Sequence, residues 1–162
     1  MNISTSNKRV LIYGDSITWG RIALKTGRYD SSTRWTCLVQ KQLGDNVEII
    51  EEGLRARMLA GENPYFKDRD GLRQFGPILG SHLPLALVVL FLGTNDMNKK
   101  NDKSPELIAT KLTDYIDAIK KWSEEMQFTE LPKVLIISPP LIDESRLRGE
   151  TMFDGGGIKS RK

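Results

Sequence analysis

The sequence predicts a three-layer α/β domain with a mostly parallel sheet, and three observations support this prediction. Apolar, strand-like runs alternate along the chain with amphipathic helix patterns, the order that builds a parallel sheet covered by helices. Residues 85–92 are apolar throughout, as is typical of a parallel strand covered on both faces. Residues 105–126 carry apolar side chains every three or four positions, which predicts a long amphipathic helix.

The expected strands are short apolar runs that end at Gly, Asp, Ser or Pro. They cover residues 8–13, 47–50, 85–92 and 133–137. The expected helices cover residues 35–43, 72–79 and 105–126. Gly44 ends the first helix, while Ser104 and Pro105 begin the last, since serine caps a helix and proline fits its first position. No strand pattern follows Pro140, so the recognisable fold stops after the fourth strand.

The length and composition are those of one globular domain. The chain has 162 residues, 39% hydrophobic and 28% charged, so we expect a single domain over residues 1–162. A net charge of +3 is too small to predict nucleic-acid binding. No apolar run approaches the ~20 residues of a membrane span, and the N-terminus lacks a signal-peptide core. The chain has one cysteine, Cys37, and one histidine, His82, which argues against a disulfide framework and a metal site. Together with the absence of a membrane span and of a signal peptide, this predicts a cytoplasmic protein without a membrane partner.

The functional residues are expected where strands end, because ligands of open α/β sheets bind beyond the carboxyl ends of the strands. Gly14-Asp15-Ser16 follows the first strand, Gly53 the second, and Gly93-Thr94-Asn95-Asp96 the third. A serine near a helix N-terminus suits a nucleophile, because local N–H groups favour negative charge on the adjacent oxygen. The Gly53 N–H and the Asn95 amide would complete an oxyanion hole. Each residue alone is more often a cap or turn residue, so the prediction rests on their combination.

These residues resemble the conserved blocks of the SGNH (GDSL) hydrolase family. Gly14-Asp15-Ser16-Ile17-Thr18-Trp19-Gly20 is similar to the first block, Gly53 to the second, and Gly93-Thr94-Asn95-Asp96 to the third. The flanking sequence is similar to the bacterial arylesterase and acyltransferase branch. The similarity runs from about residue 8 to about residue 140, which is most of the chain.

The resemblance implies a flavodoxin-like fold and a serine ester hydrolase, acting on a small-molecule ester through an acyl-enzyme. The enzyme would be a carboxylesterase or arylesterase, or an acyltransferase, without metal or organic cofactor. Ser16 would be the nucleophile, and the Ser16 and Gly53 N–H groups with the Asn95 side chain would bind the oxyanion. Asp15, Trp19 and Thr94 are expected near the substrate, with Asp15 mainly structural and Trp19 in an acyl pocket or the core.

The catalytic aspartate and histidine that the resemblance implies are missing from the chain. The family carries them in an Asp-x-x-His block near its C-terminus, and this sequence has no such motif. His82 precedes the third strand, at the amino end of the sheet, about nine residues at ~3.3 Å each from the end that carries Ser16. We therefore expect His82 to be structural, and the 162 residues to be a fragment of a longer hydrolase, truncated after the fourth strand.

The alternative to an enzyme is an inactive acyl- or ester-binding module, which keeps the oxyanion donors and lacks the base. A receiver or cofactor-binding domain and an α/β-hydrolase are disfavoured, because the sequence lacks GxxxxGK[ST], GxGxxG and G-x-S-x-G. Arg55 and Arg57 are expected in a solvated loop or in salt bridges, with an anionic substrate as the other interpretation. The apolar edge strand at residues 134–137 would favour a homo-oligomer.

Overall fold

A parallel sheet forms the centre of the fold in the computed structural model, which describes residues 8–23, 25–98, 100 and 103–143. Its strands are β1 (Lys8–Gly14), β2 (Val47–Gly53), β3 (Leu87–Phe91) and β4 (Lys133–Ile136). Within the described residues they lie in the order β2-β1-β3-β4, and every neighbouring pair is parallel. The predicted α/β class and the parallel sheet are confirmed.

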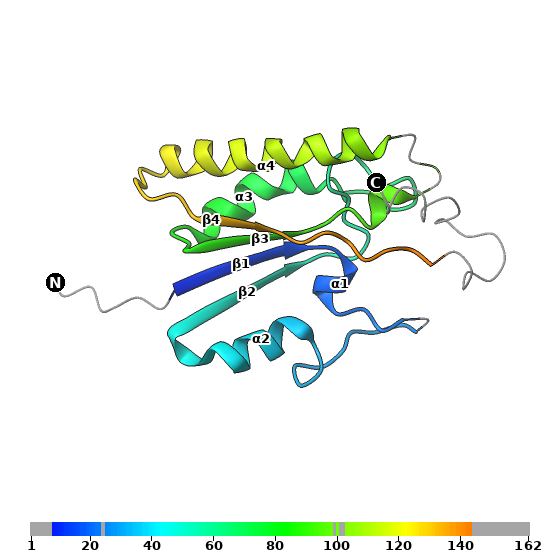
Figure 1. Ribbon diagram of the computed structural model, residues 1–162, viewed down its shortest axis with the longest axis horizontal. Coiled ribbons are helices and arrows are strands. Elements are labelled where there is room, and N and C mark those ends of the chain that lie inside the picture. Colours follow the sequence, from blue (N-terminus) through cyan, green and yellow to red (C-terminus); the bar gives the residue numbers. More distant parts are fainter. Residues whose placement is uncertain (1–7, 24, 99, 101–102, 144–162) are drawn as a thin grey trace.

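Helices cover both faces of the sheet, which gives the predicted three layers (Figure 1). One face carries α3 (Gly71–His82) and α4 (Pro105–Glu125), and the other carries α1 (Ser16–Trp19) and α2 (Trp35–Leu43). Two short 3-10 turns, η1 (Gly44–Asn46) and η2 (Asn95–Met97), complete the described helical elements. The Ser104 side chain accepts a hydrogen bond from the Leu107 N–H, so the predicted start of α4 is confirmed.

Two strands differ in length from their predictions. β2 continues three residues beyond the predicted 47–50 because its pairing with β1 runs on to Gly14 and Gly53. β3 is shorter than the predicted 85–92, although Leu85 and Leu92 are both buried. A run of apolar residues indicates that their side chains are buried, whereas a β-strand also requires backbone hydrogen bonds to a neighbouring strand. β1 and β3 pair over only five residue pairs, so the buried apolar run is longer than the strand.

The larger hydrophobic core lies between the sheet and the helices α3 and α4. Its centre is a cluster of three buried aromatic rings: Tyr13, Phe75 and Tyr115. The ring centroids of Phe75 lie 5.0 Å from Tyr13 and 4.8 Å from Tyr115, in tilted arrangements that suit the ring quadrupoles. Both phenol groups are satisfied, because the Tyr13 hydroxyl donates to the Gly71 carbonyl and the Tyr115 hydroxyl to the Leu59 carbonyl.

Two glycines of α3 make room for an indole ring of α4. A Cβ atom at Gly76 would overlap Trp122, and a Cβ at Gly80 would lie 2.7 Å from the same ring. Because residues four apart share a helix face, Gly76 and Gly80 form one shallow groove in which Trp122 packs. This explains why a helix that contains Gly76 and Pro77 is nevertheless formed: tertiary packing offsets the low helix propensity of these residues.

The outer edge of β2 is paired by a side chain rather than by another described strand. The Gln40 amide accepts a hydrogen bond from the Ile49 N–H at 2.7 Å and donates one to the Val47 carbonyl at 2.7 Å. α2 therefore turns polar residues toward β2, and the apolar face that the spacing predicts is only partly buried. Leu38 and Leu43 are 42% and 49% exposed.

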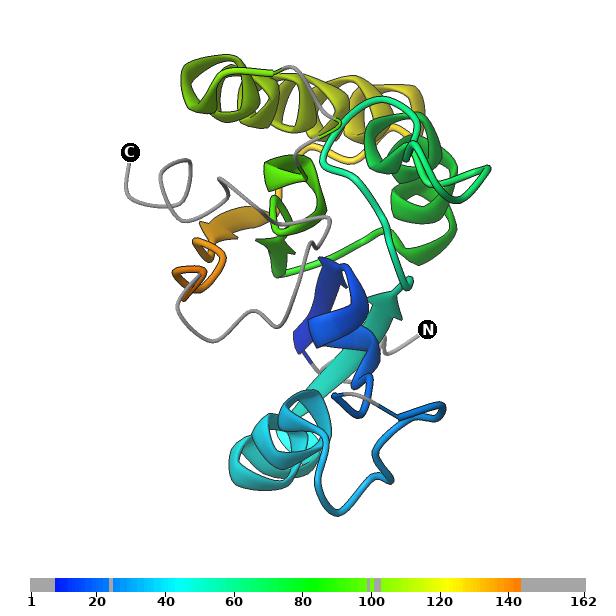
Figure 2. The ribbon, with the colours of Figure 1, turned by 90° about the vertical axis from the view of Figure 1, so that its right-hand side faces the viewer.

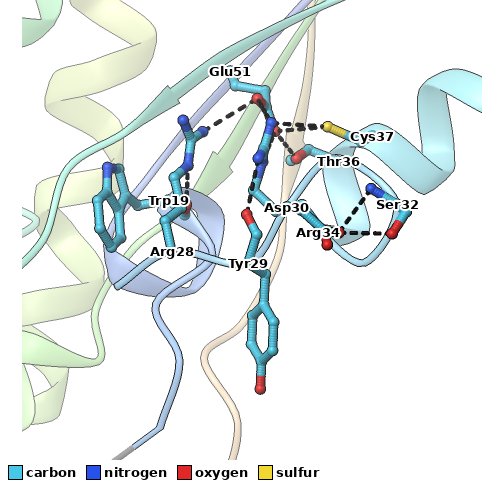
Figure 3. Close-up of polar contacts among 9 residues, drawn as sticks. All are labelled: Trp19, Arg28, Tyr29, Asp30, Ser32, Arg34, Thr36, Cys37 and Glu51. Atoms are coloured by element: carbon cyan, nitrogen blue, oxygen red, sulfur yellow. Dashed lines mark hydrogen bonds and ion pairs between the residues drawn. The ribbon is translucent and has the colours of Figure 1, made fainter. Parts of the chain in front are cut away.

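One carboxylate, that of Glu51, joins α2, β2 and the loop of residues 21–34 (Figure 3). Glu51 accepts hydrogen bonds from Arg34 at 3.1 and 3.0 Å, from Arg28 at 3.2 Å, and from the Thr36 hydroxyl. The same two arginines also bind main-chain carbonyls, since Arg28 donates to Trp19 at 2.6 Å and Arg34 to Tyr29 at 2.9 Å. The loop is thus held against the end of α1.

The groove of Gly76 and Gly80 yields a prediction about stability. Gly76→Ala should lower the free energy of unfolding by about 1–3 kcal/mol, because overlap with Trp122 outweighs the gain in helix propensity. Urea denaturation measures this change. In a Trp122→Leu background the same substitution should be neutral or stabilising, and a stabilising effect in the natural background would contradict the packing argument.

Removing the charge of Glu51 should destabilise the protein in a pH-dependent manner. Burial acts to raise the pKa of Glu51, but hydrogen bonds from Arg34 and Thr36 outweigh it and hold the pKa below its ordinary value. The stabilisation is therefore present above the ordinary carboxyl pKa and is lost as the pH falls through the lowered one. Glu51→Gln should cost about 1–3 kcal/mol at neutral pH, measured by urea denaturation.

The difference between Glu51→Gln and the natural protein should shrink in acid. Glu125→Gln, which alters an exposed ion pair with Lys121 on α4, is the matched control and should have little effect. A loss of stability for Glu51→Gln that stays constant from neutral to acid pH would show that the carboxylate charge is not what holds the loop.

Candidate active site

The predicted site residues meet at the carboxyl edge of the sheet, which faces the viewer in Figure 2. The strand register places Gly14 beside Gly53 on one side and beside Phe91 on the other. The segments that leave these three strands therefore start next to one another, as parallel pairing requires. A hydrogen bond of 3.1 Å from the Leu54 N–H to the Gly14 carbonyl extends the pairing beyond the end of β2.

Ser16 is the first residue of α1, directly after the cap residue Asp15. The Asp15 carboxylate accepts a hydrogen bond from the Ile17 N–H at 2.8 Å, so it caps the helix as an N-terminal aspartate should. Ser16 is half-buried, whereas Asp15 is only 1% exposed. The serine is thus held in a fixed turn between strand and helix.

Two glycines let α1 lie directly on the ends of the strands. A Cβ atom at Gly14 would overlap the Thr18 side chain, and a Cβ at Gly53 would overlap the backbone of Trp19. The close approach of Gly53 to α1 brings the end of β2 next to the helix that carries Ser16. A larger residue at either position would push α1 away from the sheet.

Asn95 comes from the turn η2 after β3 and is buried, with 8% of its surface exposed. Its amide nitrogen lies 3.5 Å from Asp15 Oδ2 and donates a hydrogen bond of 2.9 Å to the Arg57 carbonyl. The structure therefore brings Asn95 to the residue that precedes Ser16. Thr94, also expected near the substrate, is half-buried and occupies the cap position of η2.

Arg57 is a buried arginine, 3% exposed, and the expectation of a solvated or ion-paired loop residue is wrong for it. Its guanidinium donates to the Gly14 carbonyl at 3.0 Å and to the Glu52 carbonyl, and it lies 4.0 Å above the Tyr13 ring. Burial lowers the pKa of Arg57. No local sequence pattern distinguishes Arg57 from the exposed Arg55, so sequence reasoning missed its position beneath the site.

Asp15 and Asp96 are two buried carboxyl groups at this edge of the sheet. Burial raises the pKa of Asp15 to about 6, although the Ile17 N–H acts against it. Burial likewise raises the pKa of Asp96 to about 6, against the hydrogen bond that Asp96 accepts from the Leu59 N–H at 2.7 Å. Both carboxyl groups bind main-chain N–H groups, which fits the expectation that Asp15 is mainly structural.

A depression of about 570 Å³ opens beside Ser16. Its walls come from α1, from the loop that Glu51 holds and from the start of α2: Ser16, Ile17, Gly20, Arg21, Ala23, Tyr29, Thr33, Arg34 and Trp35. Trp35 thus faces the depression, whereas Trp19 does not line it. The Trp19 ring lies instead between the guanidinium groups of Arg28 and Arg55, at 5.6 and 5.5 Å.

His82 is the last residue of α3, and its imidazole ring points toward the sheet. Its Nε2 lies 3.0 Å from Glu52 Oε1, and Glu52 pairs in register with Tyr13 near the carboxyl edge. The His82 carbonyl accepts a hydrogen bond of 2.6 Å from Arg9, at the start of β1, so the residue lies at the amino end of the sheet as predicted, while its ring reaches Glu52. The expectation of a structural role agrees with this contact, because α3 and α1 lie on opposite faces (Figure 1).

No group of three or more His, Cys, Asp or Glu side chains in the described part of the chain could hold a metal ion. Among the helices described, none is both long and apolar enough to cross a membrane.

Comparison with known proteins identifies the family. The model of the GDSL-like lipase/acylhydrolase family matches residues 12–151. The native aryl esterase of M. smegmatis is 34% identical, with a TM-score of 0.86 over 95% of this chain and 74% of that chain. Est24, a carbohydrate acetylesterase from Sinorhizobium meliloti, is 36% identical, with a TM-score of 0.83 and the same coverage. A search of the curated proteins found no match.

The fold, the turn at Gly14-Asp15-Ser16 and the family match all agree. The match extends over most of the chain, and the two structures just named are those of ester hydrolases. The chain therefore belongs to the GDSL-like lipase/acylhydrolase family of SGNH hydrolases.

Proposed function

We propose that the protein is a serine ester hydrolase that acts on small-molecule esters through an acyl-enzyme on Ser16. The observation that carries the proposal is that Ser16, Gly53 and Asn95 follow three neighbouring strands at one edge of the sheet. Of the three, Ser16 lines the open depression. The aryl esterase and the acetylesterase among similar structures favour an aryl or short acyl ester as the substrate.

In the proposed reaction the Ser16 hydroxyl oxygen attacks the ester carbonyl carbon. Its proton passes to a general base of the Asp-x-x-His type, which these 162 residues do not contain. The carbonyl oxygen becomes an oxyanion, which the N–H groups of Ser16 and Gly53 and the Asn95 amide would stabilise. The Asn95 amide donates to the Arg57 carbonyl at 2.9 Å and to Asp15 Oδ2 at 3.5 Å, so an oxyanion would have to replace the longer of these two hydrogen bonds. The C–O bond of the ester then breaks, and the alcohol leaves with the proton.

A water molecule would next attack the acyl carbon, releasing the acid and restoring the Ser16 hydroxyl. An alcohol in place of water would give acyl transfer, which we include in the proposal on the same chemistry. The proton acceptor is not His82, the single histidine of the chain, because its ring is bound to Glu52 on the opposite face from α1. The lone cysteine, Cys37, supports a reducing compartment, so we also propose a cytoplasmic location.

Ser16→Ala tests the nucleophile. Turnover of p-nitrophenyl acetate should fall by a factor on the order of 10⁶, the cost of removing a serine nucleophile in the well-studied case of subtilisin. A fluorophosphonate probe should add one adduct to the natural protein and none to the variant, as intact-mass spectrometry would show. Ser31→Ala, on the exposed loop, is the matched control; equal turnover in Ser16→Ala would refute the assignment.

The second candidate function is ester binding without turnover, and the position of His82 favours it. The proposed oxyanion donors follow neighbouring strands, and the one histidine lies on the other face of the sheet from α1. A serine without a base is a weak nucleophile at neutral pH. Under this alternative the protein would bind an acyl ligand saturably, form no adduct with the fluorophosphonate and hydrolyse no ester.

Asn95→Ala tests whether the Asn95 amide donates to the oxyanion, both for an esterase and for a protein that binds esters without turnover. The loss of one hydrogen bond to a charged or developing oxyanion should reduce turnover roughly 100-fold, or weaken binding of a boronic acid that mimics the tetrahedral state. Asn63→Ala is the matched control, because Asn63 is also buried and also donates to a loop carbonyl, that of Ala56 at 3.0 Å. Equal effects of both variants would mean that Asn95 is only structural.

A further inference from the structure

The indole ring of Trp19 lies at the end of the helix that carries Ser16, between two arginines. Arg28 lies 5.6 Å from the ring centroid and Arg55 lies 5.5 Å from it. Ser16 and Trp19 are the first and last residues of α1, about one helical turn apart, and of the two only Ser16 lines the depression. Trp19 and its two arginines thus lie next to the depression, at the end of the helix that begins with Ser16, rather than in its lining.

The two arginines differ in what else they contact. The Arg28 guanidinium donates to the Trp19 carbonyl at 2.6 Å and to Glu51 at 3.2 Å, so its charge is already paired. The Arg55 side chain is exposed, and among the described residues no carboxylate forms an ion pair with it. Its recorded contact is the face of the Trp19 ring, which holds the cation in place while leaving its N–H donors to solvent.

The carboxylates near this end of the sheet are already committed to other groups. Glu51 binds Arg28 and Arg34, and Glu52 binds His82. Asp15 is buried and caps α1. Asp96 is buried and accepts a hydrogen bond from the Leu59 N–H. Among the described residues, then, Arg55 is an exposed cation without an ion pair to a carboxylate.

We propose that Arg55, held against Trp19, binds a negatively charged group on the ester, so that the enzyme prefers acidic esters to neutral esters of the same shape. This inference rests on the proposed function and names its substrate class. A guanidinium suits the task, since its planar donors can bind two oxygens of a carboxylate together. The Trp19 ring restricts the side chain in advance, which lowers the entropic cost of binding.

A matched pair of substrates tests the inference: 3-acetoxybenzoate, which is negatively charged, and 3-acetoxybenzamide, which is neutral. Arg55→Gln should lower kcat/KM for the benzoate roughly fivefold, the effect of an exposed charge pair, and leave the benzamide unchanged. Arg55→Lys should retain part of the preference, because lysine keeps the charge and loses the bidentate geometry. Equal losses for both esters, or none, would overturn the inference.

The matched control is Arg73→Gln, since Arg73 is an exposed arginine of α3, on the opposite face from α1. It should change neither substrate. A loss of preference in Arg73→Gln equal to that in Arg55→Gln would mean that overall charge, rather than Arg55, selects the acidic ester.

Binding of benzoate and benzamide, measured by isothermal titration calorimetry, separates this inference from the proposed function. Benzoate should bind more tightly, and its advantage should decrease with added salt and in Arg55→Gln. If neither ester is hydrolysed but benzoate is still preferred, the esterase proposal fails and the anion site stands. If esters are hydrolysed and benzamide binds as well as benzoate, the esterase proposal stands and the anion site is refuted.

Discussion

The site depends on one buried cation, the guanidinium of Arg57. It donates to the carbonyls of Gly14 and Glu52, at the ends of two neighbouring strands, and lies over the Tyr13 ring. Its own carbonyl accepts the hydrogen bond from Asn95, on a third segment. Burying a charge is costly unless polar groups replace water. Here two carbonyls and an aromatic face replace part of it, while Arg57 Nε is buried without a hydrogen-bond partner among the described residues. Arg57 therefore joins the segments that carry the candidate catalytic residues.

Glu51 and Glu52 are adjacent in β2, yet their side chains lie on opposite faces of the sheet. Because successive side chains point to opposite faces, Glu51 meets Arg34 beside α2, while Glu52 meets His82 at the end of α3. The first holds the wall of the depression beside Ser16. The second holds the single histidine away from it. The same alternation thus shapes the candidate pocket and keeps His82 from acting as the base.

Much of the fold could be predicted from the sequence, because strand and helix patterns are local. The limits of α2 agree with the prediction, since Gly44 ends it, and the start of α4 agrees because Ser104 caps it. The buried face of α2 could not be predicted. Its apolar residue Leu38 remains 42% exposed, because Gln40 of the same helix pairs with the edge of β2. Which side of α2 faces the sheet depends on the backbone groups of β2 that Gln40 binds, and the spacing of apolar residues within α2 does not reveal them.

The family and the parallel sheet could be predicted from sequence patterns alone. So could the candidate residues Ser16, Gly53 and Asn95, because each lies at or just after the end of a predicted strand. Which of the two arginines is buried could be learned from the three-dimensional packing but not from the sequence. Arg55 and Arg57 lie two residues apart in one loop, yet one lies on Trp19 and the other beneath the site. The physical reason is that burial of a charge depends on partners brought together by long-range packing, and nothing in the local sequence records them.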